Sequence, residues 1–238
     1  MTLYQRGYII KAQSTKQHTE RKVNDMCIIC ISNKGTRQPN AKEIKTMWEA
    51  NPHGAGYMFL NKDNDVEIHK GFMELADFMR AVKSENFTAD DVVIYHFRIS
   101  TQAGVNPEMT HPFPLSRNIE DMKALDLLCH VGIAHNGIIP LTTDKNDKEY
   151  SDTAHFIAEY LPQILRYPED LKDDKVLKII QELAKSKLAI LDNTGHIALI
   201  GHFITDDSGL IYSNGSYKEY DDDNLINLWD RNTWKYKN

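Results

Sequence analysis

The feature that most restricts the fold of this chain is the grouping of its short apolar runs. Runs rich in β-branched and aromatic residues predict strands, because such side chains suit a pleated, half-buried surface. These runs cover residues 27–31, 57–60, 66–69, 92–98, 127–134, 188–191, 197–203 and 210–212. Longer segments with a helical apolar period predict helices over residues 42–50, 73–82, 151–165 and 171–185. The strands come in groups and do not alternate with helices, so the sequence predicts a layered α+β fold rather than a βαβ alternation.

Between two of the predicted strands, residues 99–126 contain Gly104, Pro107, Pro112 and Pro114. This composition predicts a long loop. A loop of that length inside a compact domain is usually functional.

Polar segments flank the predicted domain. Residues 1–26 carry no periodic apolar pattern, and we interpret them as an extension without regular structure, a propeptide, or a start site assigned too early. The domain is expected over residues 27–217. Residues 218–238 form a tail that is first acidic and then aromatic and basic. We expect its acidic stretch to be solvated rather than to bind a metal, and its aromatic end to pack on the core.

Composition excludes several classes of protein. The net charge of −6 argues against a broad nucleic-acid interface. No apolar run approaches the roughly 20 residues that span a bilayer, and residues 1–25 lack the apolar core of a secretory signal. Three cysteines in 238 residues argue against a disulfide framework and favour a reducing compartment, which makes the cytoplasm the expected location.

Cys27 and Cys30 match the C-x-x-C pattern of redox and zinc sites. The two-residue period of a strand places them on opposite faces, which disfavours a dithiol pair. Cys129, His130 and His135 are further candidate zinc ligands, but no second pair has the spacing of a zinc finger. We therefore expect Cys30 and Cys129 to be core cysteines.

Cys27 differs because Met26 precedes it. If residues 1–26 are absent, Cys27 becomes the first residue and its thiol lies beside a free α-amine. The pKa of an α-amine is about 7.7–8.0 and that of a thiol about 8.5, so the amine is a matched base near neutral pH. One residue would then supply both the nucleophile and the base.

Three further motifs have an ordinary structural interpretation beside a chemical one. Arg98 ends a predicted strand, where it could form an ion pair or hold a substrate carboxylate bidentately. His135-Asn136-Gly137 could be a plain turn, or the Asn136 amide and the Gly137 N–H could form an oxyanion hole, where one donor typically contributes ~3–4 kcal/mol. Asp152 could cap a helix or hold an ammonium group.

Taken together and in this order, the motifs resemble those of the class II glutamine amidotransferases. The matching segments are Met26-Cys27, a Gly-rich segment at residues 51–56, His-x-Arg-x-x-Thr at residues 96–101, Thr-His-Pro-Phe at residues 110–113, His-Asn-Gly at residues 135–137 and Ser-Asp-Thr at residues 151–153. Tyr212-Ser213-Asn214 is similar to the closing strand of small members. The resemblance covers about residues 26–217.

The resemblance implies a four-layer α/β/β/α sandwich of the N-terminal nucleophile hydrolase type. It also implies hydrolysis of glutamine to glutamate and ammonia through a γ-glutamyl thioester, without a metal or other cofactor. The residues implied are the nucleophile Cys27, the oxyanion donors Asn136 and Gly137, and the substrate-binding Arg98, Thr101 and Asp152.

The chain departs from the family pattern at His53, where many members carry an acidic residue, and at Gln102, where synthase-linked members often carry histidine. No nucleotide-binding motif follows the domain, so an ammonia-accepting synthase would be a separate polypeptide. Two alternatives stay open: an amidohydrolase acting on a γ-glutamyl amide of a small metabolite, and a non-catalytic binding module that retains residues 1–26.

Overall fold

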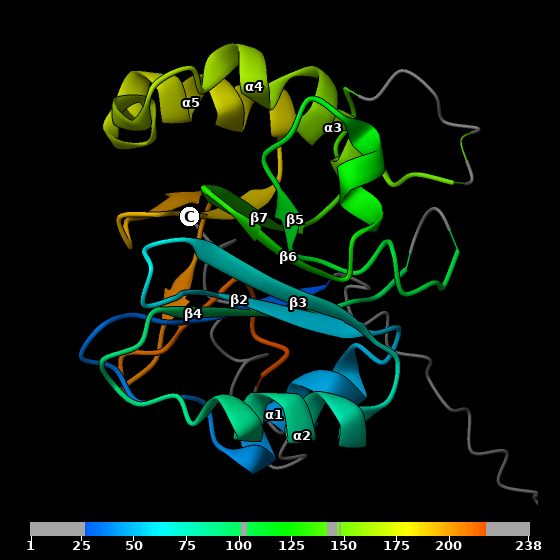
Figure 1. Ribbon diagram of the computed structural model, residues 1–238, viewed down its shortest axis with the longest axis vertical. Coiled ribbons are helices and arrows are strands. Elements are labelled where there is room, and N and C mark those ends of the chain that lie inside the picture. Colours follow the sequence, from blue (N-terminus) through cyan, green and yellow to red (C-terminus); the bar gives the residue numbers. More distant parts are fainter. Residues whose placement is uncertain (1–26, 101–103, 142–146, 148, 218–238) are drawn as a thin grey trace, which may run out of the picture.

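The structure, a computed structural model, describes residues 27–100, 104–141, 147 and 149–217 (Figure 1). The predicted extension of residues 1–26, the tail of residues 218–238, and the predicted positions Thr101 and Gln102 lie outside the described residues. The rest is an α+β arrangement of two antiparallel sheets with helices, which confirms the predicted class.

The larger sheet has the strand order β10-β11-β1-β4-β2-β3-β6, and every neighbouring pair is antiparallel. Its strands are β1 (Ile28–Ser32), β2 (Ala55–Leu60), β3 (Val66–Phe72), β4 (Val93–Phe97), β6 (Asp126–Cys129), β10 (Ile204–Thr205) and β11 (Ile211–Tyr212). Strand β1 lies inside the sheet, with Cys30 opposite Tyr95 of β4 on one side and Tyr212 of β11 on the other. The first residue of the predicted domain therefore leads directly into a strand that is paired on both sides.

The smaller sheet has the order β5-β7-β8-β9 and is also antiparallel. Its strands are β5 (Phe113–Pro114), β7 (Val131–Asn136), β8 (Lys187–Asp192) and β9 (Ile197–Ile200). Asn136 is the last residue of β7, so the predicted oxyanion residues stand where this strand ends.

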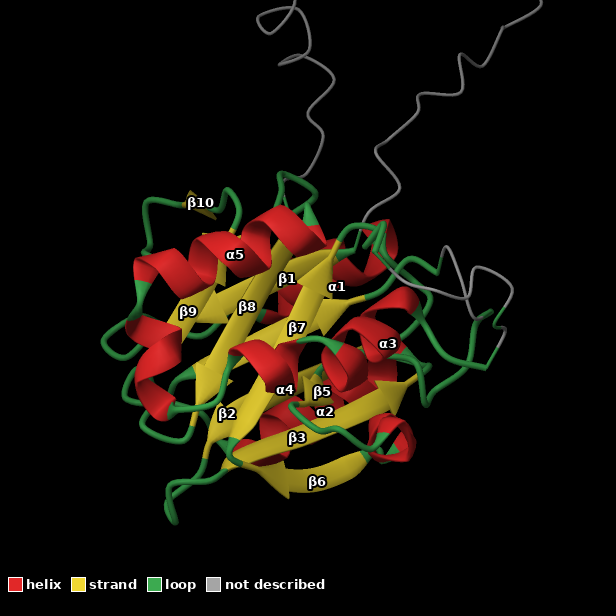
Figure 2. Ribbon diagram, turned by 90° about the horizontal axis from the view of Figure 1, so that it is seen from above, coloured by secondary structure: helices red, strands yellow, loops and turns green. Residues whose placement is uncertain are grey.

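Helices cover the outer faces of the two sheets (Figures 1 and 2). They are α1 (Ala41–Ala50), α2 (Leu75–Glu85), α3 (Asp152–Glu159), α4 (Leu161–Ile164) and α5 (Asp174–Ala184), with short 3-10 turns η1 (Ile119–Lys123) and η2 (Pro168–Lys172). Figure 1 shows α1 and α2 against the larger sheet and α3, α4 and α5 against the smaller one.

Three hydrophobic clusters hold the helices and the two sheets in this arrangement. Trp48 and Phe78 of α1 and α2 pack with Cys30 on one face of the larger sheet. The other face, with Ile29 and Ile31, packs against residues of β7 and β8. Helices α3 and α5 share a third cluster with the outer face of the smaller sheet. Alternation along β1 thus sends neighbouring residues into different cores, as the two-residue period of a strand requires.

The prediction of one strand over residues 127–134 is wrong. The structure divides this run at His130 into β6, which pairs with β3, and β7, which pairs with β5 and β8 in the other sheet. An apolar run predicts extended backbone, but it carries no information about which sheet each half joins. Leu128 is exposed on β6, although it lies inside the apolar run.

Other boundaries also differ from the predictions. The expected loop of residues 99–126 contains the short strand β5 and the turn η1. The expected helix of residues 151–165 is divided at Tyr160 into α3 and α4, because Pro162 lacks the N–H that a continuing helix needs and suits the first turn of a new one. Over the part of the chain that the structure covers, no helix combines the length and apolar character needed to cross a bilayer.

Candidate active site

Cys27 lies directly before β1 and is buried, with 9% of its surface exposed. Its thiol is held by the backbone at the end of β4: the Ile99 N–H donates to Sγ at 3.4 Å, and Sγ donates to the Ile99 carbonyl at 3.5 Å. The Cys27 carbonyl accepts a hydrogen bond from Asn214 Nδ2 at 2.8 Å. The sulfur and the main chain of this residue are thus both fixed by neighbouring strands.

The electrostatic surroundings of Cys27 come from two of the predicted substrate-binding residues. Burial raises the pKa of the Cys27 thiol, while the hydrogen bond from Ile99 and the charge of Arg98 lower it and the charge of Asp152 raises it slightly. Burial is the largest of these effects, so the thiol is protonated at neutral pH. A nucleophile in this position requires a base to remove its proton.

Arg98 follows β4 and has 4% of its surface exposed. Its N–H donates to the Gly54 carbonyl at 2.8 Å, and its carbonyl accepts from the His53 N–H at 2.9 Å. Burial lowers the pKa of the guanidinium, and the charges of Cys27 and Asp152 raise it. An arginine retains its charge under such conditions, so it places a cation beside the thiol.

His53, to which the sequence assigned no role, supports the segment that carries Arg98. Its Nδ1 accepts a hydrogen bond from the Ser100 N–H at 3.0 Å. Because a ring nitrogen accepts only when it carries no proton, this contact requires the Nε2–H tautomer of the neutral ring. This contact ties the segment of His53 to the segment that follows Arg98.

Asn136 and Gly137 stand at the end of β7. Asn136 is fully buried, and its Nδ2 donates to Ser213 Oγ at 2.8 Å. Gly137 has a φ of 142°, and a Cβ built on it would lie 2.7 Å from Cβ of Ser186. Both the conformation and the close approach require glycine at this position. The amide nitrogen predicted to serve the oxyanion thus already contacts a hydroxyl, and the Gly137 backbone is held in a conformation that other residues rarely adopt.

Asp152 is the first residue of α3. Ser151 caps this helix by accepting from the Ala154 N–H at 3.2 Å. The Asp152 carboxylate accepts from the Thr153 N–H and from the Ile139 N–H, both at 2.7 Å. The second bond ties the segment that follows Gly137 to the start of the helix. Ser151 and not Asp152 is thus the cap of α3, while the Asp152 carboxylate binds N–H groups at the helix start and lies within electrostatic range of Cys27.

Three buried histidines lie behind the site. The ring centroids of His96 and His111 are 4.4 Å apart, and those of His111 and His135 are 6.1 Å apart. His96 Nε2 donates to the His135 carbonyl at 2.9 Å, and His135 Nδ1 contacts Thr153 Oγ1 at 2.7 Å. Burial lowers the pKa of His96 to about 3 and that of His135 to about 4, and it also lowers the pKa of His111. At neutral pH these rings are uncharged and connect the two sheets with α3.

The structure therefore brings Cys27, Arg98 and Asp152 within electrostatic range of one another. Asn136 is joined to β1 through Ser213, which also accepts from the Ile29 N–H at 2.9 Å. Thr101 is outside the described residues. Sequence reasoning missed Ser213 and Asn214 as site residues. The available signal was their place at the end of the closing strand, but no residue type there predicts a contact with Cys27.

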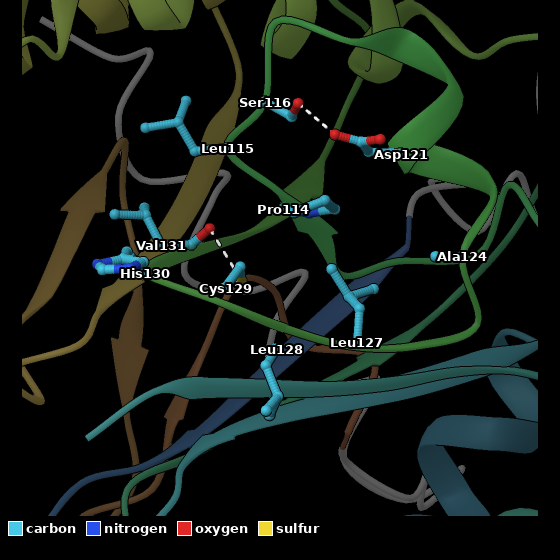
Figure 3. A pocket seen from close by; sticks show the side chains of 10 residues that line it. All are labelled: Pro114, Leu115, Ser116, Asp121, Ala124, Leu127, Leu128, Cys129, His130 and Val131. Atoms are coloured by element: carbon cyan, nitrogen blue, oxygen red, sulfur yellow. Dashed lines mark hydrogen bonds between the residues drawn. The ribbon is translucent and has the colours of Figure 1, made fainter. Parts of the chain in front are cut away.

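One cavity lies away from the predicted site. A cavity of about 430 Å³ between the edge strands β5 and β6 contains none of the predicted site residues (Figure 3). Its lining includes Cys129 and His130, and the Cys129 thiol donates to the Val131 carbonyl at 3.3 Å. Among the described residues, no three His, Cys, Asp or Glu side chains are grouped so that they could hold a metal ion.

No family model matches the chain, and a search of curated proteins finds no match either. The inference of function therefore depends on the chemistry of the site itself.

Proposed function

We propose that the chain is a glutaminase of the class II amidotransferase type, with Cys27 as an N-terminal nucleophile. Glutamine would be hydrolysed to glutamate and ammonia, and the ammonia would be used by a separate acceptor enzyme. The fold we propose is the four-layer α/β/β/α sandwich of these hydrolases. The positions of the three hydrophobic clusters, two outside the sheets and one between them, support this proposal.

The observation that carries the proposal is that a buried thiol, a cation and an anion from separate parts of the chain lie within electrostatic range of one another. A free amino acid carries both an α-carboxylate and an α-ammonium group. Arg98 suits the first and Asp152 suits the second. Cys27, within electrostatic range of both, would then face the side-chain amide of the bound substrate.

The proposed reaction begins when the Cys27 α-amine takes the thiol proton and the sulfur attacks the amide carbon. Negative charge develops on the amide oxygen, where the Asn136 amide and the Gly137 N–H would stabilise it. The C–N bond breaks, and ammonia leaves with the proton returned by the amine. Water, deprotonated by the same amine, then attacks the thioester, and glutamate leaves as the thiol is reprotonated.

This chemistry requires a free amine on Cys27. The raised pKa of the buried thiol supports the same requirement, since a protonated sulfur needs an adjacent base. The full-length chain is then the inactive form and the chain beginning at Cys27 the active one.

The test compares the full-length protein with a form that begins at Cys27, by intact mass before and after exposure to an electrophilic glutamine analogue. We expect only the Cys27-initiated form to gain one analogue mass, to release glutamate and ammonia from glutamine, and to lose both properties on Cys27→Ala. Cys30→Ala, three residues along the chain, is the matched control and should behave as the wild type.

Labelling without turnover of glutamine, but with turnover of another γ-glutamyl amide, would change the substrate and keep the mechanism. An unlabelled, inactive Cys27-initiated protein would overturn the proposal in favour of a binding module.

A further inference from the structure

Ser213 joins three strands at the proposed site. It follows β11 and is fully buried. Its hydroxyl oxygen accepts from the Ile29 N–H at 2.9 Å and from Asn136 Nδ2 at 2.8 Å. Its own N–H donates to the Ile29 carbonyl at 3.0 Å, and its carbonyl accepts from Lys187 Nζ of β8. With its main chain held from both sides, the hydroxyl has a fixed position against the end of β7.

The donors and acceptors around this hydroxyl do not balance. Asn136 Oδ1 is buried and has no hydrogen-bond partner within the described residues. Ser213 Oγ already accepts two hydrogen bonds, and among the described groups none accepts its own proton. A buried acceptor without a donor is therefore next to a buried donor without an acceptor, which is a costly arrangement.

A half turn of the Asn136 amide about its Cβ–Cγ bond pairs these two groups and leaves the amide nitrogen as the one group without a partner among the described residues. Asparagine oxygen and nitrogen positions are assigned from the surrounding hydrogen bonds, and a hydroxyl can donate as well as accept. After the turn, Ser213 still accepts from Ile29 and donates its proton to Asn136 Oδ1. The amide nitrogen is then directed away from Ser213 and is available to another acceptor.

We propose that Ser213 is a positioning residue, whose hydroxyl donates to Asn136 Oδ1 and so leaves the amide nitrogen to donate to the oxyanion formed at Cys27. Cys27 lies two residues before Ile29. The two side chains therefore point to the same face of the larger sheet, which for Ile29 is the face that packs against the smaller sheet. Asn214, the next residue, holds the Cys27 carbonyl. One dipeptide after β11 thus fixes both the nucleophile and the oxyanion donor. This inference rests on the proposed glutaminase activity.

The test is a double-mutant cycle in the Cys27-initiated protein, using the γ-glutamyl amide that the wild type hydrolyses. Ser213→Ala should lower kcat about tenfold with KM unchanged, the effect of one ordinary hydrogen bond. In the Asn136→Ala background the same substitution should lower kcat no further, because the residue acts through the amide. Ser213→Thr keeps the hydroxyl and should retain most of the activity, and Ser208→Ala, in the turn before β11, is the matched control.

If Ser213→Ala does not fold, Ser213→Cys replaces it, since cysteine is similar in size and a weaker donor, with the same expectations. An unchanged kcat in Ser213→Ala, or a full further loss in the Asn136→Ala background, would overturn this inference alone. A wild type inactive on every γ-glutamyl amide would overturn the proposed function together with it.

Discussion

The proposed site is built from two regions of different construction. The strand region comprises Cys27 and Arg98, which stand at the ends of neighbouring strands of the larger sheet, and Asn136, which ends β7 of the smaller one. The helix region comprises Asp152 and the segment after Gly137, which are held by a helix cap and by side-chain contacts to single N–H groups. In the strand region, main-chain hydrogen bonds hold Arg98 on both sides, and the Ile99 backbone holds the Cys27 thiol.

The difference indicates that the two regions affect different kinetic constants. A nucleophile and an oxyanion donor must be placed to within a fraction of an ångström, and strand ends offer that precision. Binding an ammonium group tolerates more movement, and a helix start that also carries a favourable carboxylate is sufficient for it. We therefore expect changes at Cys27 and Asn136 to alter kcat and changes at Asp152 to alter KM.

The largest effect is expected from Cys27→Ala in the Cys27-initiated form. Loss of the nucleophile should lower kcat by at least ~10⁴-fold, because it removes the covalent route. Ammonia release measured with a coupled assay checks this. Equal loss in Cys30→Ala, three residues along the chain in the helix-side core, would show that position near β1 rather than thiol chemistry explains the effect.

Asn136→Ala should lower kcat by ~10²–10³-fold and leave KM nearly unchanged, since an oxyanion donor acts only in the transition state. Steady-state kinetics separate the two constants. A rise in KM with constant kcat would instead place Asn136 with the substrate-binding groups and break the division between the regions.

Asp152→Asn should raise KM by ~10–100-fold, the factor for a charged hydrogen bond of about 1.5–3 kcal/mol, with a smaller change in kcat. Asparagine can still accept from the Thr153 or Ile139 N–H, so α3 is expected to stay folded. Circular dichroism of the variant confirms the fold, and a kcat effect larger than the KM effect would argue against a binding role.

Acidic pH should lower the free energy of unfolding, because the neutral ring of His135 joins β7 to α3. Its pKa is about 6.5 in the unfolded chain and about 4 when folded, so below pH 6.5 the unfolded state binds more protons. The stabilisation is complete above pH 6.5 and is lost as pH falls towards 4. For His135 alone this is about 2 kcal/mol between pH 7 and pH 5.

Denaturant unfolding at several pH values measures this effect. His135→Gln should weaken the pH dependence, whereas the matched control His202→Gln, at an exposed position, should keep it. The same slope in both variants would assign the acid sensitivity to other groups.

The smallest effect is expected from Ser151→Ala, which removes the cap of α3. The free energy of unfolding should fall by about 1 kcal/mol, and KM should change little because Asp152 keeps its own N–H contacts. Ser84→Ala, an exposed serine near the end of α2, serves as the control. A KM change as large as that of Asp152→Asn would mean that the helix region is as strictly positioned as the strand region.

Much of the fold could be predicted because its determinants are local. The apolar runs and the cap at Ser151 depend on neighbouring residues, so the α+β class and most elements follow from them. The division at His130 could not be predicted, since it depends on which sheet each half joins.

The candidate site divides in the same way. Cys27, Arg98 and Asp152 have side chains whose chemistry suggests a task. Ser213 and His53 act through hydrogen bonds to residues distant in sequence, so their residue types alone give no signal.

The contact between Ile29 and Ser213 spans 184 positions in the sequence. Contacts of such long range form late in folding, because a large loop must close before they contribute. The environment of Cys27 is therefore completed only when the last described strand joins the larger sheet. Partly folded chains would carry the thiol without its surroundings, so the appearance of selective thiol reactivity during refolding would mark the final step of assembly.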